Sequence, residues 1–555
     1  MKIIILGGYG VFGGRLAELL SDNPDITLFI CGRNLDRATQ FCDNFRGVAA
    51  VQPAQLDRSA LDQHMDRLSP DLVIDASGPF QNYGDDGYRV IETCIRFKVS
   101  YLDFADAAEF VFGISKFDQA AKEAGIFVLS GVSSFPVLTA AVLREISKTM
   151  EIETVQGGIA PSPYAGIGLN VMRAVLGYAG APVKLTRNGK RTTARGMTES
   201  KRYTITVPGL LPLKNIRFSL VDVPELQVLP PEIPGLKDIW MGAGPVPETL
   251  HRMLNLLAKA RAKFNLPSFA PLAPIFYKIL NLMKFGEHRG GMFVHVTGRQ
   301  DGEPVERSWH LLAEGDDGPY IPSMAIEAIV RKHLKAESPE HGARPATRAL
   351  TLADYQVQFE NRTIYMGFRA PPNADAALYR QILGNAFDRL PPQVQALHDD
   401  TAARTWAGIA RVQRGTGLLS KALGRLFGFP EATSQCPVKV QFEPHEGGEK
   451  WTRTFGHESF SSLQFAGTGR NDKLLVERFG PINVALALVI DDGKLFLIPR
   501  RWSLIGIPLP KVFLPSGSSY EMQKDGTFHL DVEISAPVIG LIAAYQGSLE
   551  PLAQP

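Results

Sequence analysis

Cysteine, net charge and long hydrophobic runs are all scarce in this chain of 555 residues. The four cysteines show no C-x-x-C spacing, so neither a metal site nor a disulfide framework is indicated, and a reducing cytoplasm is the expected compartment. A formal net charge of +2 gives no electrostatic reason to expect a nucleic-acid partner. No stretch reaches the ~18 apolar residues of a membrane span. Met1 leads directly into an apolar run, which leaves no room for a cleavable signal.

The remaining composition is that of an ordinary globular protein, with 45% hydrophobic and 21% charged residues. A chain of this length is too long for one hydrophobic core, so we expect about three domains. Alternating β/α patterns predict a first domain over residues 1–130, and mixed patterns predict a second over 131–345. A connecting segment over 346–371 and a third domain over 372–555 complete the expected organisation.

The opening residues contain the most informative motif, because an apolar run from Lys2 leads into a glycine turn and then a helical pattern. In that context G-x-G-x-x-G is the spacing that binds a dinucleotide. The first glycine would permit a tight turn, the second the approach of a pyrophosphate, and the third close packing of the helix. N–H groups at the helix start would hold the phosphates. We therefore predict cofactor contacts from Gly8, Tyr9, Gly10, Val11, Phe12 and Gly13.

The predicted second strand, 26–30, is followed by Arg33 and not by a carboxylate. An Asp or Glu at this point would bind both ribose hydroxyls of NAD, whereas an arginine accommodates the 2′-phosphate of NADP. Arg37, one helical turn further, could assist Arg33. The residues therefore favour NADP over NAD, although a solvated loop charge is the alternative reading of Arg33.

Further strands are predicted at 47–52, 71–76, 99–104 and 126–130, with helices at 87–97 and 116–124. This alternation indicates an α/β fold with a Rossmann-type, doubly wound parallel sheet. The 71–76 run leads into Ser77 and Gly78, which we predict to contact the nicotinamide half of the cofactor.

Four motifs together resemble the saccharopine-dehydrogenase-like oxidoreductases, and the match covers residues 1 to about 350. The motifs are the glycine turn at 7–13, the segments 78–84 and 101–104, and the turn at 131–136. The resemblance implies an NAD(P)-binding Rossmann domain, then an α+β substrate domain whose last helix packs on the first. Many relatives carry Thr-Gly-Glu where this chain has Ala105-Asp106-Ala107, so an amino-acid-type substrate is not implied.

Asp106 is the candidate acid–base residue, because a desolvated carboxylate beside the crevice would have a raised pKa. The alternative is an N-cap of a helix that begins near Ala107. In the second domain Tyr164, Asn170 and Arg173 are candidates to orient a substrate. The hairpin histidines, His295 and His310, are better explained as sheet-surface or core residues than as ligands.

Residues 251–290 carry seven Lys or Arg and one acid, beside apolar residues at helical spacing. Leu250, Met253, Leu254 and Leu257 form one stripe, and Phe276, Ile279, Leu280 and Met283 form another. Two interpretations stay open: a peripheral contact with an anionic membrane, or amphipathic helices packed on their own domain.

The last third predicts a mainly antiparallel β domain, with strands at 437–442, 451–455, 474–479, 484–490, 494–499 and 528–534 and hairpin turns at 491–493 and 524–526. It resembles an uncharacterised bacterial domain fused behind saccharopine-dehydrogenase-like modules, which implies no site. Trp451 and Arg453 could line a pocket for an anionic or lipid-like ligand, or they could stack on an exposed strand surface without one.

The expected function is an NADP-dependent oxidoreductase that transfers hydride to or from a small-molecule or lipid-like substrate. The expected protein is cytoplasmic, with a membrane-associated form as the variant, and a homodimer is compatible with the second domain. The alternative is a non-catalytic NADP-sensing protein whose β-rich domain binds a lipid or a partner.

Overall fold

The computed structural model describes residues 1–166, 168–245, 247–282, 284–371 and 373–552. The chain forms two compact units. The N-terminal unit contains residues 1–203 and 216–366, and the C-terminal unit contains residues 204–215 and the chain from Gly367 onward. Pro372, the expected first residue of the third domain, lies outside the described residues.

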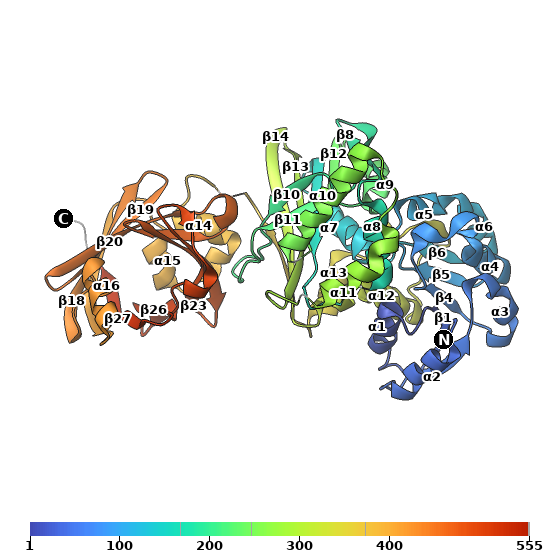
Figure 1. Ribbon diagram of the computed structural model, residues 1–555, viewed down its shortest axis with the longest axis horizontal. Coiled ribbons are helices and arrows are strands. Elements are labelled where there is room, and N and C mark those ends of the chain that lie inside the picture. The colour runs from blue at the N-terminus through green and yellow to red at the C-terminus, as the bar shows by residue number, and fades with distance from the viewer. Residues whose placement is uncertain (167, 246, 283, 372, 553–555) are drawn as a thin grey trace. The chain divides into compact units, whose positions relative to one another are not determined.

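A parallel sheet of seven described strands, in the order β15-β6-β5-β4-β1-β2-β3, begins the N-terminal unit (Figure 1). Its strands are β1 (Lys2–Leu6), β2 (Thr27–Gly32), β3 (Ala50–Gln55), β4 (Leu72–Asp75), β5 (Ser100–Asp103), β6 (Phe127–Ser130) and β15 (Gly342–Pro345). Its helices are α1 (Val11–Leu19), α2 (Leu35–Asn44), α3 (Asp62–Leu68), α4 (Arg89–Phe97), α5 (Ala108–Phe112) and α6 (Asp118–Ala124). The predicted Rossmann-type fold is confirmed.

Continuous apolar runs explain why these strands are central. Ile3, Ile4 and Ile5 in β1 and Leu72 to Ile74 in β4 are fully buried, as expected when helices cover both faces of a sheet. The predicted third strand was placed three residues too early. The N–H groups of Val48 and Ala49 donate to the Ser21 carbonyl after α1, so β3 begins only at Ala50.

The second sheet of this unit is mixed and has the order β10-β11-β12-β7-β13-β14-β16 over the described residues. Its strands are β7 (Glu151–Ala160), β10 (Ser200–Tyr203), β11 (Ile216–Leu220), β12 (Asp238–Ala243), β13 (Arg289–Gln300), β14 (Glu303–Glu314) and β16 (Ile364–Arg369). A separate hairpin pairs β8 (Pro182–Arg187) with β9 (Lys190–Arg195). The helices are α7 (Thr139–Ile146), α8 (Leu169–Tyr178), α9 (Glu225–Val228), α10 (Glu248–Phe264), α11 (Ala273–Leu282), α12 (Ile321–Leu334) and α13 (Leu352–Phe359).

Helix α12 packs back on α1, as the resemblance implied. The Ser323 hydroxyl donates to the Phe12 carbonyl, and the Arg331 guanidinium donates to the Leu19 carbonyl and to Asp22. The second sheet is thereby attached to the first helix of the dinucleotide fold.

Helices α10 and α11 pack on their own domain along one face, and the membrane contact stays a prediction. Leu250, Leu254 and Phe276 are buried in one cluster with α8, so one face packs on the domain. Met253 and Ile279 are exposed, however, although they were expected in the same stripes, and Met283 lies outside the described residues. Among the helices that the structure describes, none combines the length and apolar character needed to cross a membrane.

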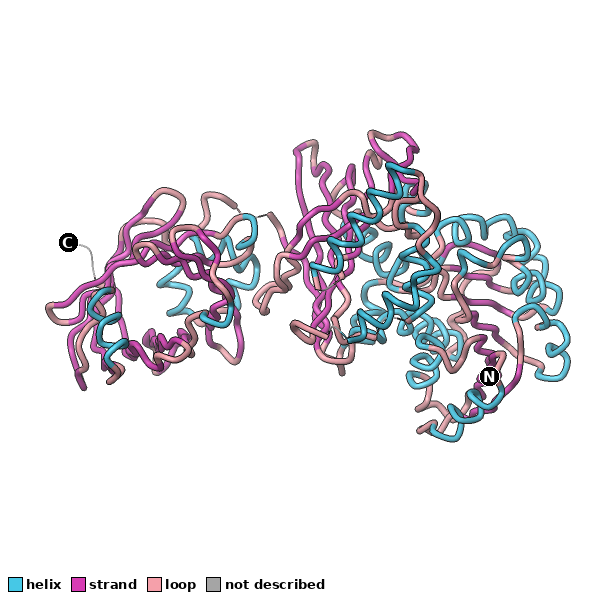
Figure 2. Tube along the Cα trace, in the orientation of Figure 1, coloured by secondary structure: helices cyan, strands magenta, loops and turns pink. Residues whose placement is uncertain are grey.

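The C-terminal unit is an antiparallel sheet in which β22 also pairs with β23, so ten of its described strands close into a ring (Figure 2). The strands are β17 (Arg404–Arg414), β18 (Thr433–His445), β19 (Gly448–Phe455), β20 (Glu458–Ala466), β21 (Leu475–Phe479), β22 (Ile482–Asp491), β23 (Lys494–Leu504), β24 (Ile507–Pro508), β25 (Ser519–Lys524), β26 (Thr527–Ala536) and β27 (Gly540–Pro551). The helices are α14 (Leu378–Leu383), α15 (Pro392–His398) and α16 (Leu418–Leu426). The predicted antiparallel β class is confirmed.

Residues 204–215 join this sheet although they lie between β10 and β11 in the sequence. The Ile490 N–H donates to the Gly209 carbonyl, and the Arg389 guanidinium donates to the Pro208 carbonyl. Leu211 packs on an apolar cluster of β21 and β22. The C-terminal unit is therefore built from two separate stretches of the chain.

Candidate functional site

The glycine turn connects β1 to α1 in the manner that a dinucleotide site requires. The positive φ of 73° falls on Gly7, so the tight turn is made one residue earlier than predicted for Gly8. Gly7 and Gly8 N–H groups both donate to the Cys31 carbonyl of β2. Gly10 is the N-cap of α1, and no side chain caps this helix. Gly10 and Val11 are exposed, so the N–H groups of the first turn are open to an anion.

Gly13 brings the helix close to the turn, as its place in the motif predicts. A Cβ atom at this position would lie 2.6 Å from the Gly7 carbonyl oxygen and 2.8 Å from the Gly8 Cα. Neither neighbour is a flexible side chain, so the backbone itself would have to move. The absence of a side chain at Gly13 therefore sets the distance between α1 and the phosphate turn.

Tyr9 and two arginines gather at the carboxyl end of β2. The Tyr9 ring lies against Gly32, where a Cβ would come within 2.3 Å of it, and its hydroxyl accepts from the Asn34 N–H at 3.2 Å. The Arg37 guanidinium lies 4.9 Å from the Tyr9 ring centre. Arg33 is exposed at the same strand end. The sequence from Arg33 to Leu35 supplies no carboxylate that would bind ribose hydroxyls.

The two predicted residues after β4 are held by polar contacts. The Ser77 hydroxyl donates to Asp75 Oδ1 at 2.5 Å and is 2.8 Å from the Tyr83 hydroxyl. The Gly78 carbonyl accepts from the Asn170 side chain at 2.9 Å. Burial raises the pKa of Asp75, while the Ser77 bonds lower it. Ser77 thus orders the loop, and Asn170 ties that loop to α8 of the second sheet.

Asp106 lies beside the same loop because β4 and β5 are neighbours and their ends coincide. Gln81 Nε2 donates to Asp106 Oδ1 at 3.1 Å. The helix that follows begins at Ala108 with Ala107 as its N-cap, so the alternative reading of Asp106 as the N-cap is wrong. Asp106 is accessible to solvent, yet protein surrounds it on most sides, and this desolvation raises its pKa.

A cavity of about 350 Å³ within the N-terminal unit contains Asp106. It begins at Val11 and Phe12, the first residues of α1, and is walled by α8, α10, α11 and the second sheet. Most of its lining is apolar, including Leu138, Met172 and Phe276. A volume of this size is within the range of small-molecule sites. The predicted crevice between the dinucleotide turn and the second sheet is therefore present and is hydrophobic.

Three further polar residues of the cavity were not identified from the sequence. Asp222, after β11, has a pKa of about 6, raised by burial and by the charges of Glu109 and Asp106. Burial, with Asp106 and Asp222, also raises the pKa of Tyr178, the last residue of α8. His251 lines the cavity from α10, and burial lowers its pKa to about 4, so it is neutral at neutral pH. Their positions in sequence gave no signal, because only folding brings them to Asp106.

The three residues predicted to orient a substrate, Tyr164, Asn170 and Arg173, do not all lie together. Asn170 faces the Gly78 loop and also accepts from Arg173 at 3.1 Å, which places both at the edge of the Rossmann domain. The Tyr164 hydroxyl instead donates to the Lys284 carbonyl at 3.3 Å. His310 is buried and lies 3.0 Å from the Ser308 hydroxyl, as predicted for a core histidine.

The fold and the uncapped turn define the N-terminal part as a dinucleotide-binding domain. Residues 3–129 match the family model described as the saccharopine dehydrogenase NADP binding domain, and residues 390–549 match a domain of unknown function, DUF4166. The chain therefore joins a saccharopine dehydrogenase-like NADP-binding domain to a C-terminal domain of unknown function. No curated protein sequence matches the chain.

Among solved structures, the chain is similar to several dehydrogenases over about 55–65% of its length. A probable dehydrogenase from Thermotoga maritima is 10% identical, with 64% of this chain and 93% of that chain covered and a TM-score of 0.33. The WlbA dehydrogenase from Thermus thermophilus, in complex with NAD and α-ketoglutarate, is 12% identical, with coverage of 65% and 99% and a TM-score of 0.30. An engineered D-amino acid dehydrogenase bound to NADP⁺ is 14% identical, with the same coverage and a TM-score of 0.32.

The packing at Gly13 predicts a substitution that separates turn geometry from helix propensity. Gly13→Ala should lower the free energy of unfolding by about 1–3 kcal/mol, because the new methyl group overlaps the Gly7 carbonyl. Gly177→Ala is the matched control: this α8 glycine has open space around its missing Cβ, so the change should be neutral or stabilising by up to about 1 kcal/mol. Urea titration measures both values, and equal effects of the two variants would contradict this account of the turn.

Proposed function

We propose that this protein is an NADP-dependent oxidoreductase that acts on an apolar small molecule bound in the cavity of the N-terminal unit. The observation that carries the proposal is the continuity of the two sites. Val11 and Phe12 belong both to the predicted phosphate-binding turn and to the wall of the cavity. Asp106 lies in the same cavity. A nicotinamide dinucleotide, when bound, supplies the hydride, and the protein supplies alignment and a proton.

The preference for NADP rests on the end of β2. Arg33 and Arg37 provide positive charge beside the position of the adenosine ribose, and the residues between Gly32 and Leu35 contain no competing carboxylate. Asp57, after β3, is the nearby acid; hydrogen bonds from Ser59 lower its pKa, with a smaller contribution from Arg33. The match of residues 3–129 to an NADP binding domain supports the same preference.

Arg33→Ala should therefore weaken NADPH binding by about ten- to a hundredfold, because a charge-assisted contact to phosphate is removed. NADH binding should change less than about twofold, since NADH has no 2′-phosphate. Arg46→Ala is the matched control, because Arg46 is an exposed arginine between α2 and β3 whose guanidinium donates to the neighbouring Phe45 carbonyl. Isothermal titration with both cofactors distinguishes the outcomes, and equal losses for NADPH and NADH would refute the assignment of Arg33.

Asp106 is our proposed proton donor to the substrate during reduction. It is the carboxyl group on the loop that follows β5, where the nicotinamide half of a dinucleotide passes in this fold. Its raised pKa keeps a larger fraction protonated near neutral pH than in a solvent-exposed aspartate. Asp222 lines the same cavity, and its interaction with Asp106 disfavours ionisation of both carboxyl groups together, while burial keeps Tyr178 protonated.

Asp106→Asn should lower kcat for NADPH oxidation by about 10²–10⁴ without altering NADPH affinity. With the native residue, reduction should slow as pH rises through the raised pKa, because the protonated donor is lost, and this pH dependence should disappear in Asp106→Asn. Asp222→Asn is the comparison variant and should retain most activity. The assay follows NADPH absorbance with a panel of medium-chain aldehydes, ketones, imines and enoyl compounds. Tight NADPH binding without turnover of any member would favour the non-catalytic, nucleotide-sensing alternative.

The outer surface of α10 and α11 suggests where the apolar substrate comes from. These helices wall the cavity with Leu254 and Phe276, and they also expose apolar side chains to solvent. The exposed apolar residues of the two helices are Met253, Leu256, Phe264, Ile275, Ile279 and Leu282, and the adjoining segments add Leu266, Leu272 and Phe285. Lysines at 259, 263, 278 and 284 lie among them in the sequence. We propose that this basic, apolar surface contacts an anionic membrane, from which the substrate enters the cavity.

The double substitution Leu256→Glu and Leu282→Glu should reduce sedimentation with vesicles of phosphatidylcholine and phosphatidylglycerol by about tenfold or more, because charge replaces inserted apolar area. The leucines are 68% and 82% exposed, so folding should not depend on them. Val357→Glu is the control, since Val357 is an equally exposed apolar residue on α13. If the wild-type protein does not sediment with these vesicles at low salt, the membrane contact is refuted and the oxidoreductase proposal is unaffected.

A further inference from the structure

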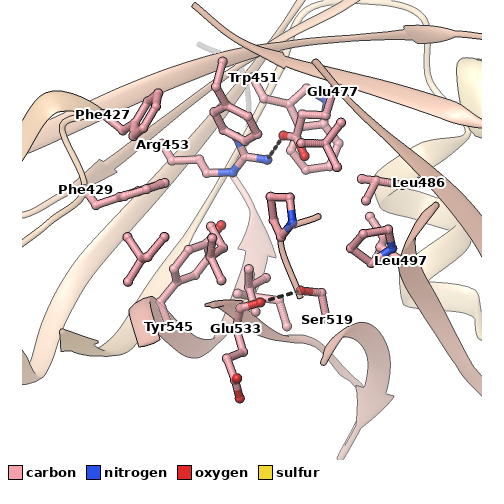
Figure 3. Close-up of a pocket in the computed structure, with 18 of the residues that line it drawn as sticks. Phe427, Phe429, Trp451, Arg453, Glu477, Leu486, Leu497, Ser519, Glu533 and Tyr545 are labelled. Atoms are coloured by element: carbon pink, nitrogen blue, oxygen red, sulfur yellow. Dashed lines mark hydrogen bonds and ion pairs between the residues drawn. The ribbon is translucent and has the colours of Figure 1, made fainter. Parts of the chain in front are cut away.

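The closed sheet of the C-terminal unit encloses a cavity of about 480 Å³, larger than the cavity of the N-terminal unit. Figure 3 shows side chains from different strands and from the α16 region pointing into one space, among them Phe427, Leu486, Leu497 and Tyr545. Protein interiors normally leave few voids larger than a water molecule. A space of this volume is within the size range of small-molecule binding sites.

The lining of this cavity is mostly apolar. Its polar side chains include a compact network around Arg453 and, apart from that network, Ser516, Ser519, Glu521 and Glu533. Arg453 of β19 donates to Glu477 of β21 at 3.1 Å and to the Ser462 hydroxyl at 2.9 Å. Gln464 donates to the same Glu477 oxygen at 3.2 Å and accepts from the Tyr379 hydroxyl at 3.1 Å. Trp451 and Arg453 are buried here, so the expectation of an exposed strand surface is wrong for this pair.

The charge of the lining argues against an anionic ligand. Arg453 is the one cation among the lining residues that the structure describes, and Glu477 already neutralises it. Glu521 adds a further carboxylate, which His398 contacts at 2.6 Å from outside the cavity lining. A carboxylate or phosphate inside this space would be desolvated without an available positive partner, which is strongly unfavourable.

Tyr545 offers a hydrogen-bonding group without a competing partner. Its side chain is 6% exposed, lines the cavity, and makes no hydrogen bond to another described residue. Burial raises its pKa to about 12, so the phenol stays protonated and able to donate. Because this phenol lines the cavity and stays protonated, a ligand in the cavity can accept its hydrogen bond.

We propose that this cavity binds an uncharged, chain-like lipid with one polar end, an alcohol, aldehyde or ester. The polar end accepts a hydrogen bond from Tyr545, and the hydrocarbon lies among Phe427, Leu486 and Leu497. This site is separate from the dinucleotide site and does not depend on the proposed reaction.

The opening of the cavity is marked by residues that both line it and reach solvent. Phe513 lines the cavity and is 54% exposed. Helix α16 contributes Leu423 to the lining while Leu418 and Leu426 on the same helix are 87% and 75% exposed. An apolar rim is the surface that a hydrocarbon chain crosses most easily when it leaves a lipid phase.

The test uses the full-length protein and the fluorescence of N-phenyl-1-naphthylamine, an uncharged apolar dye, which 1-octanol, 1-decanol or 1-dodecanol then displaces. Each added CH₂ should tighten binding up to about fourfold until the cavity is filled. Decanoate at about pH 8, where it is ionised, should bind about tenfold or more weakly than 1-decanol. Decanoate that binds more tightly than 1-decanol would overturn the uncharged class of ligand.

Substitutions in the lining test whether the dye and the alcohols bind in this cavity. Leu497→Trp fills it and should lower dye and alcohol affinity by about tenfold or more, while Phe496→Trp, on the opposite face of the same strand beside Tyr520, should change neither. Val175→Trp, which fills the cavity of the N-terminal unit, should leave this signal in place. A far-ultraviolet circular dichroism spectrum and a urea unfolding transition that match those of the wild-type protein show that Leu497→Trp is folded. Unchanged alcohol binding in that folded variant would refute the proposal.

Tyr545→Phe tests the polar end of the ligand. The variant keeps the ring and should weaken 1-decanol about five- to tenfold, because one hydrogen bond is lost, while dye affinity stays the same. Equal losses for dye and alcohol would mean that the substitution altered the cavity and not a hydrogen bond, and no loss for either would exclude Tyr545 as the contact.

Discussion

The close approach of α1 to the turn that precedes it is the constraint on which the N-terminal unit depends. Because Gly13 has no side chain, the helix starts directly above the Gly7 carbonyl, and its first N–H groups face outward without a capping side chain. The same helix carries α12 on its other side through Ser323 and Arg331. Helix α1 therefore contacts two parts of the N-terminal unit. Its uncapped first turn faces the predicted phosphate site, and its contacts with α12 hold the second sheet, which lines the cavity, in place.

Much of the architecture could be predicted because its signals are local. Buried parallel strands are continuous apolar runs, and β1 and β4 were predicted from such runs. The hairpin turns were equally clear, since Asp492-Gly493 and Asp525-Gly526 adopt the positive φ values that such turns require. Predicted strand limits were wrong where a contact with a distant part of the chain sets them. The Ser21 carbonyl, for example, accepts from the residues before β3 and so delays the start of that strand.

The candidate site was predictable only in its dinucleotide half. Arg33 follows β2 directly, Gly10 and Asp106 lie in the loops after β1 and β5, and fold topology places such residues at one edge of the sheet. Tyr178, Asp222 and His251 come from three elements of the second sheet and its helices, so no spacing relates them. The closed C-terminal sheet was recognised by class, but strands such as β17 and β27 were missed. Their glycines and charged residues interrupt the alternation, and pairing with neighbours on both sides compensates.

Residues 204–215 belong to the C-terminal unit although they lie within the sequence of the N-terminal unit, so the C-terminal unit is not one continuous segment. A gene segment that begins near Gly367 would encode ten ring strands but would omit Gly209 and Leu211, leaving a β22 amide without its acceptor and an apolar cluster uncovered. The domain boundary predicted from the sequence near residue 370 is thus not a complete boundary between the two compact units. A single cut near residue 370 therefore does not separate the complete C-terminal unit from the rest of the chain.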